Sequence, residues 1–387
     1  MTSPPSPQRL ASLDAFRGFA IASMVLVNNP GSWKYIYAPL AHSEWNGCTF
    51  TDLIFPFFLF AAGLSMAISL GKKISEGTDH PVLLRLLRSI LRRASIIFFI
   101  GVLLNFIPAF HLASLRIPGV LQRIALTIML AAPIVLWGRW RAALAAIAGL
   151  FSLYLLLMLL VPVTGADGLV AAGRLEPGND FGAWLDRIVL GGHLWASSQT
   201  WDPEGLVSTL PATASLLLGV LAGYYLAAPV RRVRKSLGLL AVGVLILGLG
   251  AWMGAILIPI NKNLWTPSFV LSTGGWSLVF LAVFHAALDE APPGFLLATR
   301  RACLPLTIYG MNALFLFVFS GIVARMLQSI HIAGGATPMT LKEKLFEAIT
   351  TLPLSPENAS LLFAVVFNLA MFAVAWVMWR KKWFVKV

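Results

Sequence analysis

Charged residues are scarce in this chain. Of its 387 residues only 12% are Asp, Glu, Lys or Arg, whereas 58% are hydrophobic and the mean hydropathy is +0.81. A soluble domain carries roughly a quarter charged residues, so this composition excludes an ordinary soluble fold. Long uncharged runs recur, as bilayer-spanning helices require, since backbone polar groups in lipid must bond within the segment. We therefore predict an all-α fold, a polytopic integral membrane protein.

Cysteine is nearly absent, with only Cys48 and Cys303. We expect these two residues near opposite faces of the membrane, so they cannot form a disulfide with each other. No spacing of Cys or His resembles a metal-ligand motif, and we predict no bound metal. The first apolar stretch contains Asp14 and Arg17 and lacks a clear cleavage site, so we interpret it as a helix rather than a signal peptide.

The apolar runs predict about ten transmembrane helices, with ends uncertain by about 2–4 residues. The predicted spans are 14–31, 53–70, 92–108, 118–137, 142–163, 206–228, 236–259, 266–287, 302–324 and 359–379. Because ten is even, both termini are expected on one side of the membrane. The whole chain, 1–387, is interpreted as a single integral-membrane domain with two longer outer loops, at about 164–205 and 325–358.

Positive charge predicts which side the termini face. Lys and Arg concentrate in the N-terminal segment, in the connections 71–93 and 229–235, and in the C-terminal run "RKKWFVKV". Since cytoplasmic loops are enriched in Lys and Arg, both termini are predicted to be cytoplasmic. The same rule explains the net charge of +13 without a nucleic-acid partner. Membrane lipid is the expected surrounding.

The stretch "LAHSEWNGCTFTDLIFPFF" places polar residues directly before an apolar run. Asp52 is expected in the first turn of the second span, where a carboxylate favours the positive end of the helix. His42 lies in the outer loop before it, beside Trp45 and Asn46. A lone loop histidine is more often a surface residue than a catalyst, so the position of His42 alone leaves both readings open.

Polar residues inside predicted spans are functional candidates, because lipid makes them costly. Asp14 and Arg17 are spaced i,i+3, which favours an ion pair at the cytoplasmic end. Arg116 precedes the fourth span and Arg123 lies more than a turn inside it. Arg123 either extends to the lipid headgroups or binds an acid, a phosphate or a carboxylate.

Further candidates lie in outer connections and in the ninth span. Asp202 and Glu204 in "TWDPEG" either cap a helix or bind a cationic or hydroxyl-rich ligand. Asn261 and Asn263 in "PINKNLW" either form a turn or contact a substrate. Asn312 in "GMN" is expected near the middle of its helix, where an amide bonds another helix.

Seven motifs occur in a fixed order: "SLDAFRG", "LVNN", "HSEWNGCTFTDLIFPFFLFAAG", "RIPGVLQR", "DPEGLVSTL", "PINKNLW" and "GMNAL". Together they resemble the heparan-α-glucosaminide N-acetyltransferase family, in a short form without the extra lumenal domain of the animal enzyme. The resemblance extends from residue 10 to about residue 315. "SLDAFRG" alone is shared with other membrane acyltransferases, whereas the ordered set is specific.

The resemblance implies transfer of an acetyl group from cytosolic acetyl-CoA to a glucosamine amine on the far side of the membrane. It points to His42 as the active-site histidine and to Asn28 beside it, with Asn29 as the alternative. The connection "NPGSWKYIYAPLA" is a few residues longer than in the animal enzyme. A bacterial inner membrane is the implied location, and a homodimer is compatible with the resemblance.

These implications assign provisional roles to the polar candidates. His42 would act as general base and Asn28 would donate to the oxyanion, while Arg17, Arg88 and Arg92 would hold the phosphates of acetyl-CoA. Substrate contacts are expected from Asp52, Arg116, Arg123, Asp202, Glu204, Asn261, Asn263 and Asn312. Two other functions stay open: a secondary transporter of sugars or cations, and an O-acetyltransferase acting on an envelope glycan.

Overall fold

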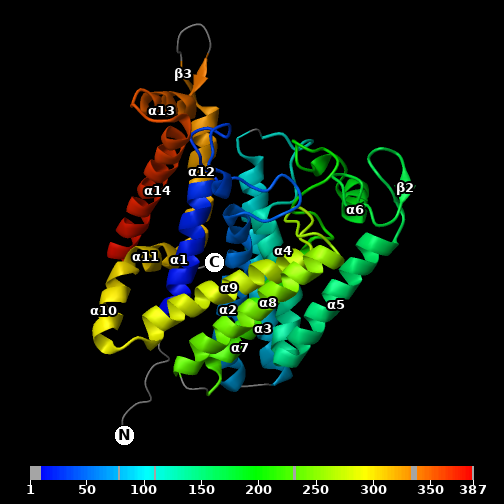
Figure 1. Cartoon of the computed structure of the whole chain (residues 1–387), viewed down its shortest axis with the longest axis vertical. Helices are drawn as coiled ribbons and strands as arrows, with labels where there is room; N and C mark the ends of the chain where they lie inside the picture. Colours follow the sequence, from blue (N-terminus) through cyan, green and yellow to red (C-terminus); the bar gives the residue numbers. More distant parts are fainter. Residues whose placement is uncertain (1–9, 77–78, 109, 230–231, 333–337, 386–387) are drawn as a thin grey trace.

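Helices make up most of the computed structural model, which describes residues 10–76, 79–108, 110–229, 232–332 and 338–385 (Figure 1). The long helices are α1 (Ala11–Val27), α2 (Phe50–Glu76), α3 (His80–Phe106), α4 (Val120–Pro133), α5 (Arg139–Leu160), α7 (Thr209–Ala227), α8 (Arg232–Ile256), α9 (Pro267–His285), α12 (Ala313–Ser329) and α14 (Pro356–Arg380). The shorter helices are α6 (Phe181–Leu190), α10 (Pro293–Ala302), α11 (Leu304–Met311) and α13 (Leu341–Thr350). This confirms the predominantly helical fold.

Strands are confined to two short antiparallel pairs. β1 (Val163–Thr164) pairs with β2 (Val170–Ala171), and β3 (His331–Ile332) pairs with β4 (Met339–Thr340). Both pairs lie in the connections that were predicted as outer loops. Figure 1 shows β2 and β3 at the end of the bundle opposite the start of α1. We call this end the His42 end and the other the Arg17 end.

Helices α2, α7 and α9 are mostly buried at the centre of the bundle, whereas α5 and α8 expose most of their apolar side chains. Close packing at the centre requires small residues. A Cβ at Gly63 would lie 1.9 Å from the carbonyl oxygen of Leu216, and one at Gly219 would lie 2.0 Å from that of Phe60. These glycines therefore let α2 and α7 approach backbone to backbone, as small residues do between membrane helices. The apolar faces of α5 and α8 suit contact with lipid.

Six helical segments of the described chain are long and apolar enough to cross a membrane, or seven with the pair α11–α12. One of them, Val120–Leu160, contains two predicted spans. At 1.5 Å per residue its 41 residues would extend about 61 Å, twice the hydrocarbon thickness. The chain turns back at Arg139, which has a φ of 56°, and Figure 1 draws α4 and α5 as separate helices. The total of ten spans is not confirmed.

The ninth predicted span, 302–324, is wrong as a single straight helix. Helices α11 and α12 meet at an angle of 82°, with Asn312 between them. The Asn312 amide does not bond another helix. It donates to the carbonyl of Trp383 and accepts from the backbone N–H of Val385, which belong to the segment after α14. Asn312 therefore completes the hydrogen bonds of a returning chain segment.

Candidate functional site

The loop that carries His42 is held by three contacts with distant segments. The Trp45 indole donates to the carbonyl of Leu175 at 2.9 Å, and the backbone N–H of Gly47 donates to the carbonyl of Ile260 at 2.7 Å. Asn46 and Asn261 form an isolated β-bridge, and the Asn261 amide donates to the side chain of Asn46. These contacts place the "HSEWNG" and "PINKNLW" motifs side by side at the His42 end. Asn261 therefore joins two loops.

His42 is bound to a buried carboxylate. Its Nδ1 lies 2.7 Å from Oδ1 of Asp52, whose side chain is 0% exposed, while the His42 side chain is 43% exposed. The other Asp52 oxygen accepts hydrogen bonds from Ser43 and Thr49, including the backbone N–H of Thr49 at 2.9 Å. Asp52 lies in the first turn of α2, as predicted. It both caps this helix and orients the imidazole.

Lys262 is a second partner of this pair. Its Nζ lies 2.8 Å and 3.2 Å from the two ring nitrogens of His42, and 3.5 Å from Oδ1 of Asp52. Burial lowers the pKa of the Lys262 ammonium below its usual value, although the carboxylates of Asp52 and Glu204 act in the opposite direction. Lys262 therefore exchanges a proton more readily than an exposed lysine.

His42 and Lys262 line a cavity of about 420 Å³, which we call the His42 cavity. Its volume lies within the range of small-molecule sites. The polar side chains that line it include those of Asn28, His42, Thr51, Arg116, Glu204 and Lys262. Asn28 ends α1 and reaches this cavity, whereas the neighbouring Asn29 does not line it and donates its amide to the carbonyl of Val25 at 2.8 Å. The geometry therefore favours Asn28 over Asn29.

Arg116, Asp202 and Glu204 form one ion cluster beside the cavity. Arg116 donates to both oxygens of Asp202, at 2.8 and 2.6 Å, and to Glu204. Burial alone would lower the pKa of Arg116, but the two carboxylates raise it above its usual value. Burial alone would raise the pKa of Glu204, but nearby cations, led by Arg116, lower it below its usual value. Both oxygens of Asp202 therefore accept hydrogen bonds from Arg116, whereas Glu204 lines the His42 cavity.

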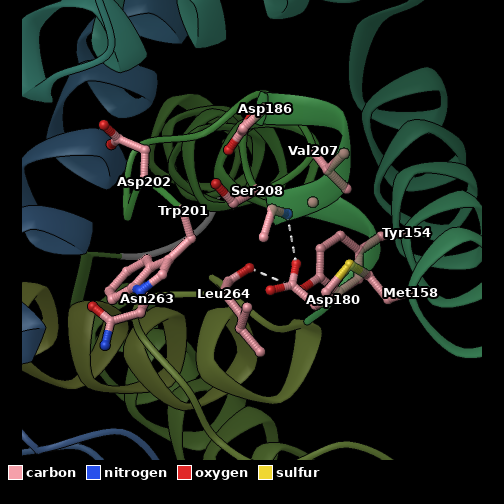
Figure 2. Close-up of a pocket in the computed structure, with 12 residues that line it drawn as sticks. Tyr154, Met158, Asp180, Asp186, Trp201, Asp202, Val207, Ser208, Asn263 and Leu264 are labelled. Atoms are coloured by element: carbon pink, nitrogen blue, oxygen red, sulfur yellow. Dashed lines mark hydrogen bonds between the residues drawn. The ribbon is translucent and has the colours of Figure 1, made fainter. Parts of the chain in front are cut away.

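Behind the cluster, the segment that carries Asp202 rests on buried acids from α6 (Figure 2). Asp186 accepts a hydrogen bond from the backbone N–H of Leu206, and Asp180 accepts one from that of Ala183. Burial raises the pKa of Asp180 to about 6 and that of Asp186 to about 7. They line a cavity of about 20 Å³, room for roughly one water.

Arg123 is 1% exposed, so it does not extend to the headgroups. Its guanidinium donates to the carbonyl of Gly205 at 3.2 Å and to the hydroxyl of Ser208, and its Cζ lies 4.9 Å from the centroid of the Trp265 ring. Arg123 lines neither the His42 cavity nor the small cavity behind it. It therefore positions the Asp202–Ser208 segment against α4.

We expect Arg123→Met to reduce turnover about tenfold, because the Asp202–Ser208 segment would shift. Loss of two hydrogen bonds to a charged group should also destabilise the fold by about 3 kcal/mol. Turnover and thermal unfolding in detergent measure the two effects. Arg141→Met is the control, because Arg141 also lies over a tryptophan, Trp140, but is exposed on α5. Wild-type turnover and melting of Arg123→Met would contradict this role.

The other predicted residues are divided between the two ends of the bundle. Asn263 lines the His42 cavity. Arg17 lies at the opposite end, in a cavity of about 470 Å³ that we call the Arg17 cavity, and forms the predicted ion pair with Asp14 at 3.5 Å. Asn312 lines the Arg17 cavity, so it is not grouped with the predicted substrate contacts around His42.

The structure places the two predicted phosphate ligands on α3 outside the Arg17 cavity. Arg88 and Arg92 are exposed and do not line the Arg17 cavity, whereas Ser89 and Arg93 do. The sequence suggested a loop over 71–93, but α3 already begins at His80. Only one face of α3 meets the cavity. Arg92 and Arg93 are consecutive residues, so their side chains leave the helix in different directions.

Lys262, Trp195 and Trp201 are among the residues of the His42 cavity that were not predicted as site residues. Lys262 stands inside "PINKNLW", between the two asparagines that were chosen, so the motif contained the signal. Trp195 and Trp201 come from the long connection 164–205. Their rings add apolar surface to the cavity, as aromatic side chains do in many small-molecule sites.

These features define a helical membrane protein with a histidine–aspartate pair in a polar cavity at one end of its bundle. Residues 9–179 match the family described as heparan-alpha-glucosaminide N-acetyltransferase, catalytic. The chain is 30% identical over 370 aligned residues to human heparan-alpha-glucosaminide N-acetyltransferase, covering 81% of this chain and 52% of that protein. The mouse protein of the same name is 30% identical over 374 residues, with 81% and 53% covered.

The chain is therefore similar to heparan-alpha-glucosaminide N-acetyltransferases, and its first half matches the catalytic family model. It spans about half the length of the curated relatives it matches. The matched region 9–179 contains Asn28, His42, Asp52 and Arg116, while Glu204 and Lys262 complete the same cavity from outside it. The structure thus joins residues from both halves of the chain in one site.

Proposed function

We propose that this protein is a transmembrane N-acetyltransferase. It moves the acetyl group of acetyl-CoA to the amine of a glucosamine-type sugar, with His42 as general base. The His42 end faces the periplasm, both termini face the cytosol, and the protein resides in a bacterial inner membrane. The observation that carries this proposal is the pairing of His42 with the buried Asp52 in a cavity that Asn28 also lines.

The His42–Asp52 contact supports the role of a base. An ionised carboxylate only accepts hydrogen bonds, so Asp52 holds the proton on Nδ1 of neutral His42 and leaves the Nε2 lone pair as the acceptor. The same logic orients the imidazole in carboxylate–histidine catalytic pairs.

In the reaction, His42 Nε2 takes a proton from the sugar amine as its nitrogen attacks the thioester carbon. The carbonyl oxygen becomes an oxyanion, to which the Asn28 amide donates a hydrogen bond. The oxyanion collapses, the C–S bond breaks, and the departing thiolate receives the proton that His42 holds. One C–N bond has formed, one C–S bond has broken, and His42 is neutral again.

Sugar recognition is assigned to the wall opposite α1. Glu204 and Asn263 accept hydrogen bonds from hydroxyls, and Trp195 and Trp201 pack against the ring. Asp202 is left out of this set because both of its oxygens are occupied by Arg116. Arg116 in turn holds Glu204 at the cavity wall.

We assign the donor to the Arg17 cavity, where Arg17 and Arg93 supply positive charge for phosphates. Along α1 the separation from Arg17 to Asn28 is eleven residues, about 16 Å. The Arg17 and His42 cavities share no lining residue, and α1 between them contributes buried Ala20, Ile21 and Met24. Passage of the pantetheine arm therefore requires these side chains to separate.

A transporter is the alternative that one observation favours. The break between α11 and α12 resembles the discontinuous helices that build transporter sites. However, the amide of Asn312 at this break is bonded to the returning segment after α14. Uptake of labelled glucosamine into proteoliposomes without acetyl-CoA would support a transporter.

The test of the acetyltransferase is release of free thiol when purified protein is mixed with acetyl-CoA and glucosamine. We expect thiol and N-acetylglucosamine in equal amounts, and no thiol without the sugar. Acetylation of a hydroxyl-only glycan in place of glucosamine would favour the O-acetyltransferase. An acetylated His42 formed from labelled acetyl-CoA alone would replace direct transfer by a two-step mechanism. Absence of thiol with every acceptor would refute the proposal.

A further inference from the structure

A second polar cavity adjoins the His42 cavity. It has a volume of about 360 Å³ and lies between α1, α3, α4 and α12. We call it the amide chamber, because its polar lining includes the side chains of Asn28, Asn29, Asn105, Arg116, Gln122 and Arg325. Met24, Asn28, Arg116 and Val120 line both cavities. A ligand that occupies one cavity can therefore extend past Asn28 into the other.

The amide chamber contains positive charge without negative charge. Arg116 and Arg325 are its only charged lining residues. Arg116 is neutralised by Asp202 and Glu204. The only side-chain hydrogen bond found for Arg325 in the described part of the chain goes to the carbonyl of Gly321 at 3.2 Å, one turn earlier in α12. Arg325 is partly buried near the end of α12 and lines a polar cavity that has no acid in its lining, so its guanidinium is available to bind an anion.

The amides of the chamber are suited to hydroxyl groups. Asn29, Asn105 and Gln122 donate their N–H groups to backbone carbonyls at 2.8 to 3.0 Å. Within the described residues, the side-chain oxygens of these three accept no hydrogen bond, so they are available to a ligand. The chamber thus offers one cation and several acceptors, a combination that fits a molecule with both hydroxyls and an anionic group.

We propose that the amide chamber binds the anionic group of a substrate whose reacting atoms lie at His42, with Arg325 as its ligand. This inference rests on the proposed acetyltransferase function and adds to it. The group is a phosphate, sulfate or carboxylate. Because the donor is assigned to the Arg17 cavity, the group is taken to belong to the acceptor sugar. The phosphates of an acetyl-CoA that enters from the His42 end are the other source, which the experiment distinguishes.

The experiment compares Arg325→Gln with wild type, using four ligands: glucosamine, glucosamine 6-phosphate, acetyl-CoA and acetyl-dephospho-CoA. Calorimetry on the purified protein measures each Kd without need of turnover, and thiol release measures each KM. We expect Arg325→Gln to weaken one anionic ligand about tenfold or more, since a charge-assisted hydrogen bond contributes about 1.5–3 kcal/mol. The counterpart that lacks this phosphate, glucosamine or acetyl-dephospho-CoA, should change less than threefold. Arg325→Lys should recover part of the loss.

The pattern identifies the source of the anion. If Arg325→Gln raises the Kd of glucosamine 6-phosphate alone, the chamber binds the acceptor. If it raises the Kd of acetyl-CoA alone, and raises that of acetyl-dephospho-CoA less, the chamber binds the donor. Arg174→Gln is the control, because Arg174 is paired with Asp167 in the connection after α5 and lines no described cavity at this end.

Two results would overturn the inference: Kd values unchanged for all four ligands in Arg325→Gln, or no binding of any of them to wild type. Failure of the proposed function looks different. Binding would then still depend on Arg325, but wild-type protein would release no thiol.

Discussion

Replacing His42 by alanine is expected to lower kcat by roughly 10²- to 10⁴-fold, the usual contribution of a general base. The imidazole is the group that Asp52 orients and that faces the cavity, and alanine cannot accept the amine proton. The fold should persist, because the His42 side chain is 43% exposed. Thiol release under saturating acetyl-CoA and glucosamine measures the loss, and thermal unfolding in detergent measures the fold.

His331→Ala is the matched control for this experiment. His331 also lies at the His42 end, but it is exposed on β3, and its ring nitrogen Nδ1 lies 2.9 Å from the carbonyl oxygen of Ser329. Its loss should leave turnover unchanged. Added imidazole should partly restore His42→Ala, since a small base can enter the vacated space. Wild-type turnover by His42→Ala would remove His42 from the mechanism.

Replacing Asn28 by alanine is expected to lower kcat by roughly 10²- to 10³-fold, the second largest effect that we predict. A donor to the oxyanion acts mainly in the transition state, so KM for either substrate should change little. Asn28→Asp should be as inactive, because a carboxylate repels the developing negative charge. Steady-state kinetics with both substrates varied distinguishes this effect from weakened binding.

Asn29→Ala provides the comparison within the same motif. The Asn29 amide is bound to the carbonyl of Val25, so its loss should change kcat less than about threefold while lowering the melting temperature slightly. A large loss of kcat in Asn29→Ala with normal turnover in Asn28→Ala would reverse the assignment. It would also contradict the orientation of the two amides in the structure.

The helical fold followed from the sequence because hydrophobic runs must bury or face lipid along their whole length. Breaks within such runs were not visible. The run 302–324 looks continuous in sequence, yet α11 and α12 meet at 82°. Asn312 lies at this break, and its side chain forms hydrogen bonds with the backbone of Trp383 and Val385, which follow α14. The arginines near α3 show the same limit. Which of Arg92 and Arg93 meets a cavity depends on helix rotation against its neighbours.

The candidate site was predicted as a set of motifs. The structure shows which of their residues form ion pairs and hydrogen bonds with one another. Arg116, Asp202 and Glu204 were separate candidates for substrate contact, but they form one ion cluster. Asp52 was expected to cap α2 and contact substrate, and it also holds His42. Lys262 and Arg325 were not chosen, because a lysine in a turn or an arginine near a helix end has no distinctive spacing.

Sequence alone determined that this is a helical membrane protein and which motifs carry its polar residues, since composition and local order are properties of the chain itself. Tertiary structure decided which polar residues are occupied by one another and which face open cavities. It brought Lys262 to His42 across 220 positions and left Arg325 facing a cavity with no acid in its lining. Such pairings depend on how helices pack, because groups distant in the chain become neighbours only when the bundle closes.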